Sequence, residues 1–213
     1  MSGRRAVLLD LDGTLTDSAP GILGSYAATL RELGHEPDPA LDMNFVIGPA
    51  LMDVMPLVLA RYGDDRVALA VATYRRIYGE TGWSNSVLYD GIAAFLAALT
   101  GRRVFLATAK RVDFARRMLE RFGVAGCFEG IHGSLPEGGL EHKPELIADI
   151  VARYGLNPAE SVMVGDRQYD ITGAHANGMR AVGVLWGYGG RAELEAAGAD
   201  MLVATPGDLL GVV

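Results

Sequence analysis

The alternation of short apolar runs with helix-period segments constrains the fold of this chain more than any other feature. Segments between the runs repeat apolar residues at helical spacing, as Phe114, Met118 and Leu119 do. This alternation predicts an α/β fold with a doubly wound, Rossmann-like parallel sheet. The runs that predict strands are Ala6–Leu9, Val104–Ala107, Val162–Val164, Ala181–Leu185, Met201–Val203 and, more weakly, Phe128–Ile131.

The alternation stops after the first apolar run and resumes near residue 88. The intervening sequence predicts helices only, over Gly21–Leu33, Leu41–Tyr62 and Arg66–Glu80. We therefore expect an all-helical cap domain at residues 16–83, inserted into an α/β core made of residues 1–15 and 84–213. An insertion after the first strand is expected to act as a lid over the carboxyl end of that strand.

Composition excludes several classes of protein. Half of the 213 residues are apolar, and the net charge of −7 gives no basic footprint for nucleic acid. The single cysteine fits a reducing compartment. The stretch from Arg4 to Leu9 is too short for a signal peptide, and no window approaches the roughly 20 apolar residues of a membrane span. We expect a soluble cytoplasmic protein with neither a nucleic-acid nor a membrane partner.

The first apolar run ends on two carboxylates, Asp10 and Asp12. An Asp-x-Asp-Gly sequence is also common in turns. An EF-hand calcium loop is excluded, because Leu15 stands at its sixth position and Gly21 at its twelfth. Two like charges at the end of a buried strand require a cation between them or a proton on one of them.

The only two lysines of the chain, against 17 arginines, each lie beside a predicted strand or helix end. We expect a strand to end at Thr108 and a helix to begin at Lys110, where a hydroxyl and free N–H groups suit an oxyanion; a helix-capping threonine is the alternative. Pro144 suits a first helical turn, so Lys143 would lie at the positive end of a helix. A lysine there is either a solvated surface residue or the partner of an anion.

A third acidic position follows the strand that ends before Gly165. Asp166 comes directly after this glycine, and Asp170 lies one helical turn further on, as a ligand or as a helix cap. The carboxyl ends of parallel strands share one edge of a sheet, so these groups are expected to converge with Asp10. Carboxylates of this kind suit a hard cation that keeps some waters, which favours Mg²⁺.

Four motifs, in order, carry a resemblance to a known superfamily: DLDGTLTDS, ATAK, HKP and GDRQYD. The chain resembles haloacid dehalogenase superfamily phosphohydrolases, in particular the phosphoglycolate phosphatase-like group with a helical cap, over most of its length. It departs from the group's pattern at Ala109, where Asn or Ser is frequent, and at Arg111, where Pro is usual. Backbone N–H contacts survive both changes.

The resemblance implies an enzyme, a Mg²⁺-dependent phosphatase that acts on a small soluble phosphate monoester through an aspartyl-phosphate. Phosphoglycolate is the expected substrate at the level of the group, and a monomer or homodimer is the expected assembly. The resemblance implies that Asp10 is the nucleophile and that Asp12 is the general acid and base. It further implies that Thr108, Ala109 and Lys143 bind the phosphate group. The implied metal ligands are Asp10, Asp166 and the backbone carbonyl of Asp12, with Asp170 as a supporting residue.

Other activities of the superfamily fit less well or remain open. A 5′-nucleotidase, a pyrophosphatase or a sugar phosphatase stays possible. Dehalogenases lack the second aspartate, here Asp12, and phosphonoacetaldehyde-type hydrolases need a cap lysine, which residues 16–83 do not contain. A sugar phosphomutase is disfavoured, because Ile22 stands where those enzymes have a basic residue. Residues 44–51 and the pair Arg75 and Arg76 are candidates for recognising the substrate, although two arginines on a solvated helix face are the simpler interpretation.

Two hypotheses from other classes are weaker. A non-catalytic phospho-receiver domain is too short to account for the chain and has no inserted cap. A nucleotide-binding module is suggested by GYGGRA at residues 187–192 with Asp208 beyond it, but this sequence follows the last full strand–helix unit. We expect the segment to form a flexible loop beside the active site.

Overall fold

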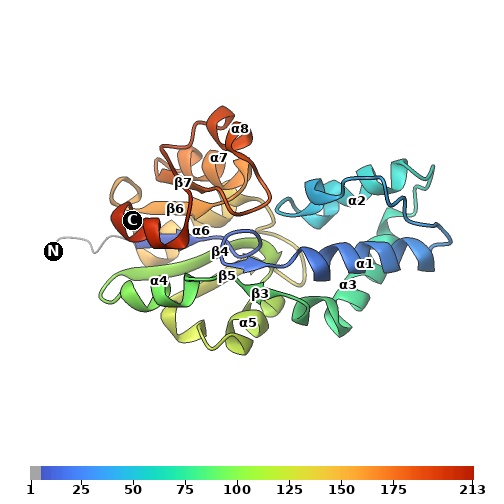
Figure 1. Cartoon of the computed structure of the whole chain (residues 1–213), viewed down its shortest axis with the longest axis horizontal. Coiled ribbons are helices and arrows are strands. Elements are labelled where there is room, and N and C mark those ends of the chain that lie inside the picture. The colour runs from blue at the N-terminus through green and yellow to red at the C-terminus, as the bar shows by residue number, and fades with distance from the viewer. Residues whose placement is uncertain (1–5) are drawn as a thin grey trace. The chain divides into compact units, whose positions relative to one another are not determined.

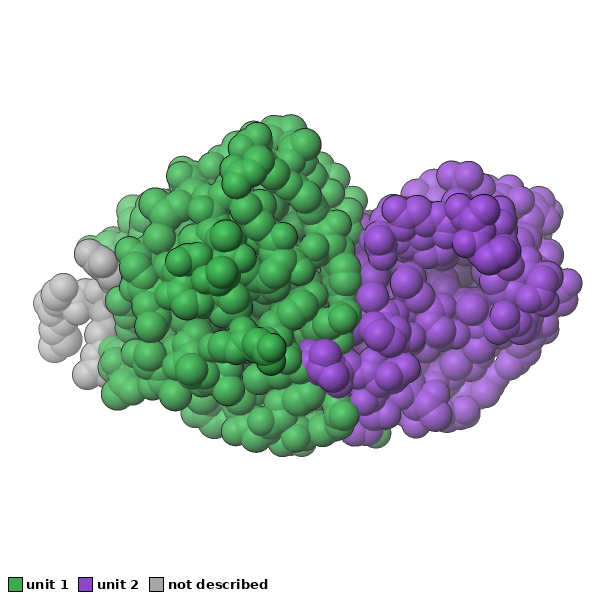
Figure 2. Space-filling view, in the orientation of Figure 1, with its two compact units in different colours: residues 1–17, 88–213 green, residues 18–87 purple. Residues whose placement is uncertain are grey.

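A computed structural model describes residues 6–213, so Arg4 and Arg5 lie outside the described residues. The chain divides into two compact units, Met1–Asp17 with Leu88–Val213 and Ser18–Val87 (Figure 2). The second unit begins two residues later and ends four residues later than the cap range expected from the sequence. The crossings lie at β2 (Thr16–Asp17) and β3 (Val87–Leu88), which pair as a two-stranded sheet.

The larger unit is built on a six-stranded sheet in the order β5-β4-β1-β6-β7-β8, in which every neighbouring pair is parallel. From β1 the chain continues to β4 and β5 on one side and then to β6, β7 and β8 on the other. The predicted doubly wound sheet is therefore confirmed, and its topological switch lies between β1 and β6. The strands are β1 (Ala6–Leu9), β4 (Arg103–Arg111), β5 (Gly130–Ser134), β6 (Val162–Gly165), β7 (Arg180–Val184) and β8 (Met201–Val203).

Helices cover both faces of this sheet, α7 and α8 on one side and α4 and α5 on the other (Figure 1). Alternate residues of β1 serve the two faces: Ala6 and Leu8 join a fully buried cluster with Ile147 of α6 and Ile171 of α7. Because every strand except the edges is buried on both sides, the sequence shows continuous apolar runs. The helices are α4 (Ile92–Ala98), α5 (Val112–Arg121), α6 (Lys143–Tyr154), α7 (Gln168–Ala176) and α8 (Arg191–Ala196).

The smaller unit is helical, with α1 (Ala19–Glu32), α2 (Leu51–Ala60) and α3 (Val67–Glu80). Tyr26 of α1 and Tyr74 of α3 pack with their ring centroids 4.7 Å apart. The helix expected over Leu41–Tyr62 is wrong in its first half, because Gly48 has a φ of +107° and the chain forms only a short 3₁₀ turn before α2. Among residues 6–213, no helix has both the length and the apolar character needed to cross a membrane.

Candidate active site

The carboxyl ends of β1 and β6 bring Asp10 and Asp166 together. The Asp10 N–H donates to the Val164 carbonyl at 3.0 Å, which extends the β1–β6 ladder to the first aspartate. The chain then turns at Gly13, whose φ is +85° and where a Cβ would lie 2.2 Å from Oδ2 of Asp166. Thr14 donates its hydroxyl hydrogen to Oδ1 of Asp166 at 3.2 Å. The turn after β1 is thus folded directly against the Asp166 carboxylate.

Lys143 enters the same cluster from the first turn of α6. Its Nζ lies 2.8 Å from Oδ1 of Asp10 and 2.5 Å from Oδ1 of Asp170, and donates to the Ala107 carbonyl at 2.8 Å. Its side chain is only 3% exposed, so this lysine is not the solvated surface residue that the sequence left open. Gly173 of α7 permits the approach, because a Cβ there would lie 2.6 Å from Cβ of Lys143.

Asp170 combines the two roles that the sequence left as alternatives. Its Oδ2 accepts a hydrogen bond from the Arg167 N–H at 3.1 Å, which satisfies a free donor at the start of α7. Its Oδ1 faces Lys143. The residue therefore stabilises the start of a helix and supplies a carboxylate to the cluster.

The segment around Thr108 differs from the expectation. Strand β4 continues to Arg111 with a register shift after Thr108, and α5 begins at Val112 instead of Lys110. Thr108 is buried, and its Oγ1 accepts a long hydrogen bond of 3.3 Å from the Lys110 N–H. Ala109, between them, is half-buried. The extended strand places these backbone groups at the same sheet edge as Asp10.

Lys110 forms an ion pair that was not predicted from the sequence. Its Nζ lies 2.9 Å from Oδ2 of Asp12, and both side chains are at least 90% buried. The only sequence signal was the scarcity of lysine, which indicated that both lysines had a specific place. The structure thus gives each of the two N-terminal aspartates its own lysine: Lys143 for Asp10 and Lys110 for Asp12.

Burial and mutual repulsion shape the charges of this cluster. Burial, together with the charges of Asp10 and Asp170, raises the pKa of Asp166 well above its ordinary value. Burial also raises the pKa of Asp170, to about 6, although Lys143 opposes this shift. Burial alone would lower the pKa of Lys143, but the carboxylates of Asp10 and Asp170 raise it above its usual range. The ammonium group therefore stays charged, while the carboxylates carry an excess of negative charge.

The same residues fit a divalent metal ion. One oxygen from each of Asp10, Asp166 and Asp170 lies within 4.8 Å of the others, and all three residues are buried. Oδ1 of Asp10 and Oδ1 of Asp170 are buried, and both lie beside the Lys143 ammonium group. The mutual repulsion of these carboxylates, which together with burial raises the pKa of Asp166, indicates an excess of negative charge at the site. An all-oxygen donor set with this excess suits Mg²⁺.

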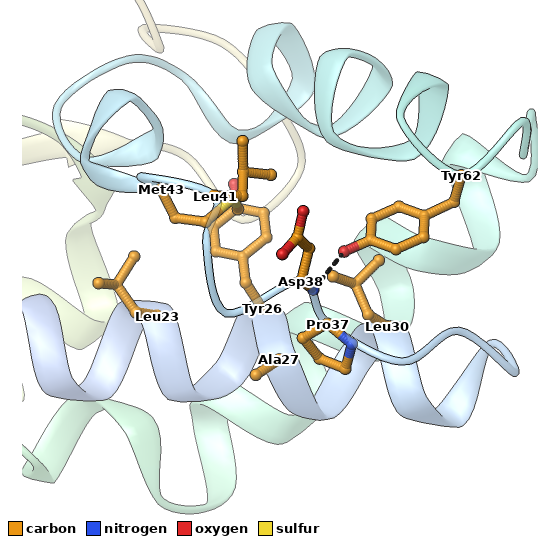
Figure 3. A pocket seen from close by; sticks show the side chains of 9 residues that line it. All are labelled: Leu23, Tyr26, Ala27, Leu30, Pro37, Asp38, Leu41, Met43 and Tyr62. Atoms are coloured by element: carbon orange, nitrogen blue, oxygen red, sulfur yellow. Dashed lines mark hydrogen bonds between the residues drawn. The ribbon is translucent and has the colours of Figure 1, made fainter.

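The smaller unit offers less for a ligand. Arg76 forms ion pairs with Glu32 at 2.5 Å and with Glu80 at 3.2 Å, so it lies on the solvated helix face that the sequence allowed. Nε of Arg75 is buried and has no hydrogen-bond partner among the described residues. A cavity of about 40 Å³ lies within this unit, lined mostly by apolar side chains such as Tyr26, with Tyr62 at one side (Figure 3). Such a volume holds about one water, not a metabolite.

Comparison with known proteins gives a family match over most of the chain. A family model described as haloacid dehalogenase-like hydrolase matches residues 4–178. The tyrosine-protein kinase PtkA of Mycobacterium tuberculosis is 38% identical over 187 residues, which cover 86% of this chain. The chain spans only 62% of the length of that relative. A 5′-nucleotidase of Pseudomonas aeruginosa is 40% identical over 89% of this chain and 86% of its own length.

Solved structures agree on the architecture. One of them is the crystal structure of a Clostridium acetobutylicum protein that is described as a predicted phosphatase. It superposes on this chain with a TM-score of 0.90 at 33% identity, over 98% of this chain and 97% of that one. Curated phosphoglycolate phosphatases also match, at 28% to 32% identity. The similarity therefore covers the sheet and the helical insertion together.

Proposed function

The chain belongs to the haloacid dehalogenase-like hydrolases, and we propose that it is a Mg²⁺-dependent phosphatase that hydrolyses a small phosphate monoester. The observation that carries this proposal is the convergence on Asp10. Lys143 of α6 lies 2.8 Å from its carboxylate, and Asp166, directly after β6, contributes a second buried carboxylate. A nucleophile flanked by a fixed cation and a metal site is suited to a phosphoryl group, whose charge must be neutralised during transfer.

In the first step, one oxygen of Asp10 attacks phosphorus. The new O–P bond forms as the bond to the leaving oxygen breaks, and Asp12 gives its proton to that oxygen. Lys143, Thr108 and the backbone N–H groups near Ala109 bind the phosphoryl oxygens. Mg²⁺, held by Asp10, Asp166 and the backbone carbonyl of Asp12, would supply further positive charge to the same oxygens.

In the second step, water attacks the aspartyl-phosphate. Asp12, now a carboxylate, takes a proton from this water, and the O–P bond to Asp10 breaks to release inorganic phosphate. Lys110 lies 2.9 Å from Oδ2 of Asp12 and holds this side chain in one orientation through both steps. Each aspartate ends in the protonation state in which it began.

The test is phosphate release from a panel of esters. The panel contains phosphoglycolate, nucleoside 5′-monophosphates, sugar phosphates and pyrophosphate, because the resemblance points to the first and the 40% identical 5′-nucleotidase supports the second. We expect multiple turnovers with Mg²⁺ and none with excess chelator. Release that is unchanged by the chelator, or a single turnover at most on every ester, would contradict the proposal.

The similarity to PtkA favours a second candidate, transfer of a phosphoryl group to tyrosine. An aspartyl-phosphate can give its phosphoryl group to a hydroxyl group instead of to water. Incubation with labelled ATP and a tyrosine-containing peptide separates the two outcomes. Label that accumulates on the peptide would support the kinase, and label found only in free phosphate would support the phosphatase.

A further inference from the structure

The segment after β7, residues 186–189, lies against the candidate active site, and no step of the proposed reaction uses it. The Trp186 indole N–H donates to the Thr14 carbonyl at 3.0 Å. The Tyr188 backbone N–H donates to Oδ2 of Asp166 at 2.8 Å, and the Tyr188 hydroxyl donates to Oδ1 of Asp17, also at 2.8 Å. The segment is therefore fixed by three hydrogen bonds, two to the chain that follows β1 and one to Asp166 after β6.

Two glycines bring the main chain of this segment close to Asp166. A Cβ at Gly187 would lie 2.3 Å from Cβ of Asp166, and a Cβ at Gly189 would lie 1.9 Å from its carbonyl oxygen. No other residue fits at either position without displacing the backbone. The glycines place the Tyr188 N–H where it can meet the carboxylate.

The hydroxyl end of Tyr188 lies where the chain crosses between its two units. Asp17 is the last residue before the Ser18–Val87 unit begins, and Tyr89 follows closely after that unit ends. The side chain of Tyr89 also lies against Tyr188, and burial raises the pKa of Tyr89 to about 12. One side chain thus meets both crossings, while its own backbone binds a carboxylate of the metal site.

We propose that Tyr188 is a positioning residue that holds the Asp166 carboxylate for Mg²⁺ and couples it to the chain crossings at Asp17 and Tyr89. This inference rests on the proposed function, because Asp166 acts there as a metal ligand. Groups that orient metal ligands from outside the coordination sphere commonly change metal affinity by 10- to 100-fold when they are removed. The Tyr188 hydroxyl acts through its own backbone, which places its effect at the lower end of that range.

The test is calorimetric titration with Mg²⁺ of the full chain carrying Tyr188→Phe. The variant keeps the N–H bond to Asp166 and loses only the hydroxyl bond to Asp17. We expect Mg²⁺ affinity to fall about tenfold. The matched control is Tyr154→Phe, which loses a hydroxyl bond of 3.1 Å to His132 in the same unit. This control should melt at a lower temperature but bind Mg²⁺ as the wild type does.

A second variant, Asp17→Ala, removes the other end of the same bond and tests the inference if Tyr188→Phe does not fold. It should weaken Mg²⁺ binding to a similar extent, and the double variant should bind no more weakly than either single one. Unchanged affinity in the single variants, or losses that add in the double variant, would overturn the coupling. A wild type that does not bind Mg²⁺ would overturn the metal site itself, which distinguishes failure of the proposed function from failure of this inference.

Discussion

Asp10 lies buried beside the Lys143 ammonium group and beside two other carboxylates, which its charge repels. After burial, the charge of Asp10 is the next cause that raises the pKa of Asp166, and it acts in the same direction on Asp170. Asp10→Asn removes this repulsion together with the nucleophile. We expect at least about a 10³-fold loss of aryl phosphate hydrolysis, as for other catalytic nucleophiles, with a higher melting temperature of the metal-free protein.

Paired measurements of turnover and thermal unfolding check both parts of this prediction. The control is Asp113→Asn, because the Asp113 side chain is 42% exposed and pairs with Arg111 away from the carboxylate cluster. It should change neither quantity appreciably. Substantial turnover by Asp10→Asn would contradict its role as nucleophile, and a lower melting temperature would contradict the electrostatic cost.

Asp12 differs from Asp10 because its proposed task is proton transfer. An asparagine there keeps the shape of the side chain but cannot donate a proton to the leaving oxygen. Asp12→Asn should therefore slow alkyl phosphates, which have poor leaving groups, by about 10²–10⁴-fold, and should slow a nitrophenyl phosphate much less. Rates measured across esters of graded leaving-group pKa test this. A uniform loss across the series would instead indicate that Asp12 serves only to hold charge or structure.

At the scale of the element, the segment after β7 depends on glycine at one position and not at the next. A Cβ at Gly189 would lie 1.9 Å from a backbone oxygen, whereas a Cβ at Gly190 would meet nothing within 4 Å. Gly189→Ala should therefore cost about 1–3 kcal/mol of unfolding free energy through overpacking, and it should displace Asp166 and lower activity. Gly190→Ala, the matched control, should leave both close to wild type. Urea unfolding and phosphate release measure the two effects, and equal behaviour of the variants would contradict the packing argument.

Elements with strong local signals were predicted well from the sequence. The strand Ala6–Leu9 ends at its predicted residue, because a buried apolar run meets a charged residue there. Strand β4 runs past its predicted end, because its pairing with β5 continues after a register shift that no local pattern shows. The helix expected from Leu41 begins only at Leu51, since the apolar spacing gave too little weight to Gly48 and Pro49.

Contacts between distant segments could not be predicted in the same way. Motifs located Asp10 and Lys143, because each follows a recognisable strand or helix signal. The pair of Lys110 with Asp12 and the bond of Tyr188 to Asp17 join residues far apart in the chain. Their geometry depends on the register of the sheet and on the close approach of glycines. These are properties of packing, which a single sequence does not display.

At the scale of the whole molecule, the carboxylate cluster links stability to pH. The pKa of Asp170 is about 6 in the folded protein, against an ordinary value of 3.8. Between these two pH values the folded state keeps a proton that the unfolded chain releases. The contribution of Asp170 to the free energy of unfolding is therefore complete below about pH 4 and is lost as the pH rises through 6. We expect the melting temperature of the metal-free protein to fall over this interval by roughly 2–4 °C per kcal/mol lost. Asp170→Asn should flatten that part of the profile, and an unchanged slope would contradict this assignment.

Mg²⁺ should reverse this dependence, because it binds the deprotonated carboxylates that the metal-free fold disfavours. At a concentration 100 times its Kd, a ligand that binds only the folded state adds about 2.7 kcal/mol, or roughly 5–10 °C for a chain of this size. Protons compete for the same oxygens, so the Mg²⁺-induced shift should be larger at pH 7 than at pH 5. Thermal unfolding at both pH values measures this shift in melting temperature. NaCl of equal ionic strength is the control for screening. Asp166→Asn should lose most of the shift, since it removes one of the carboxylates proposed to bind the metal. A shift that is larger at pH 5, or that NaCl reproduces, would mean that the buried carboxylates are held by protons and lysines alone.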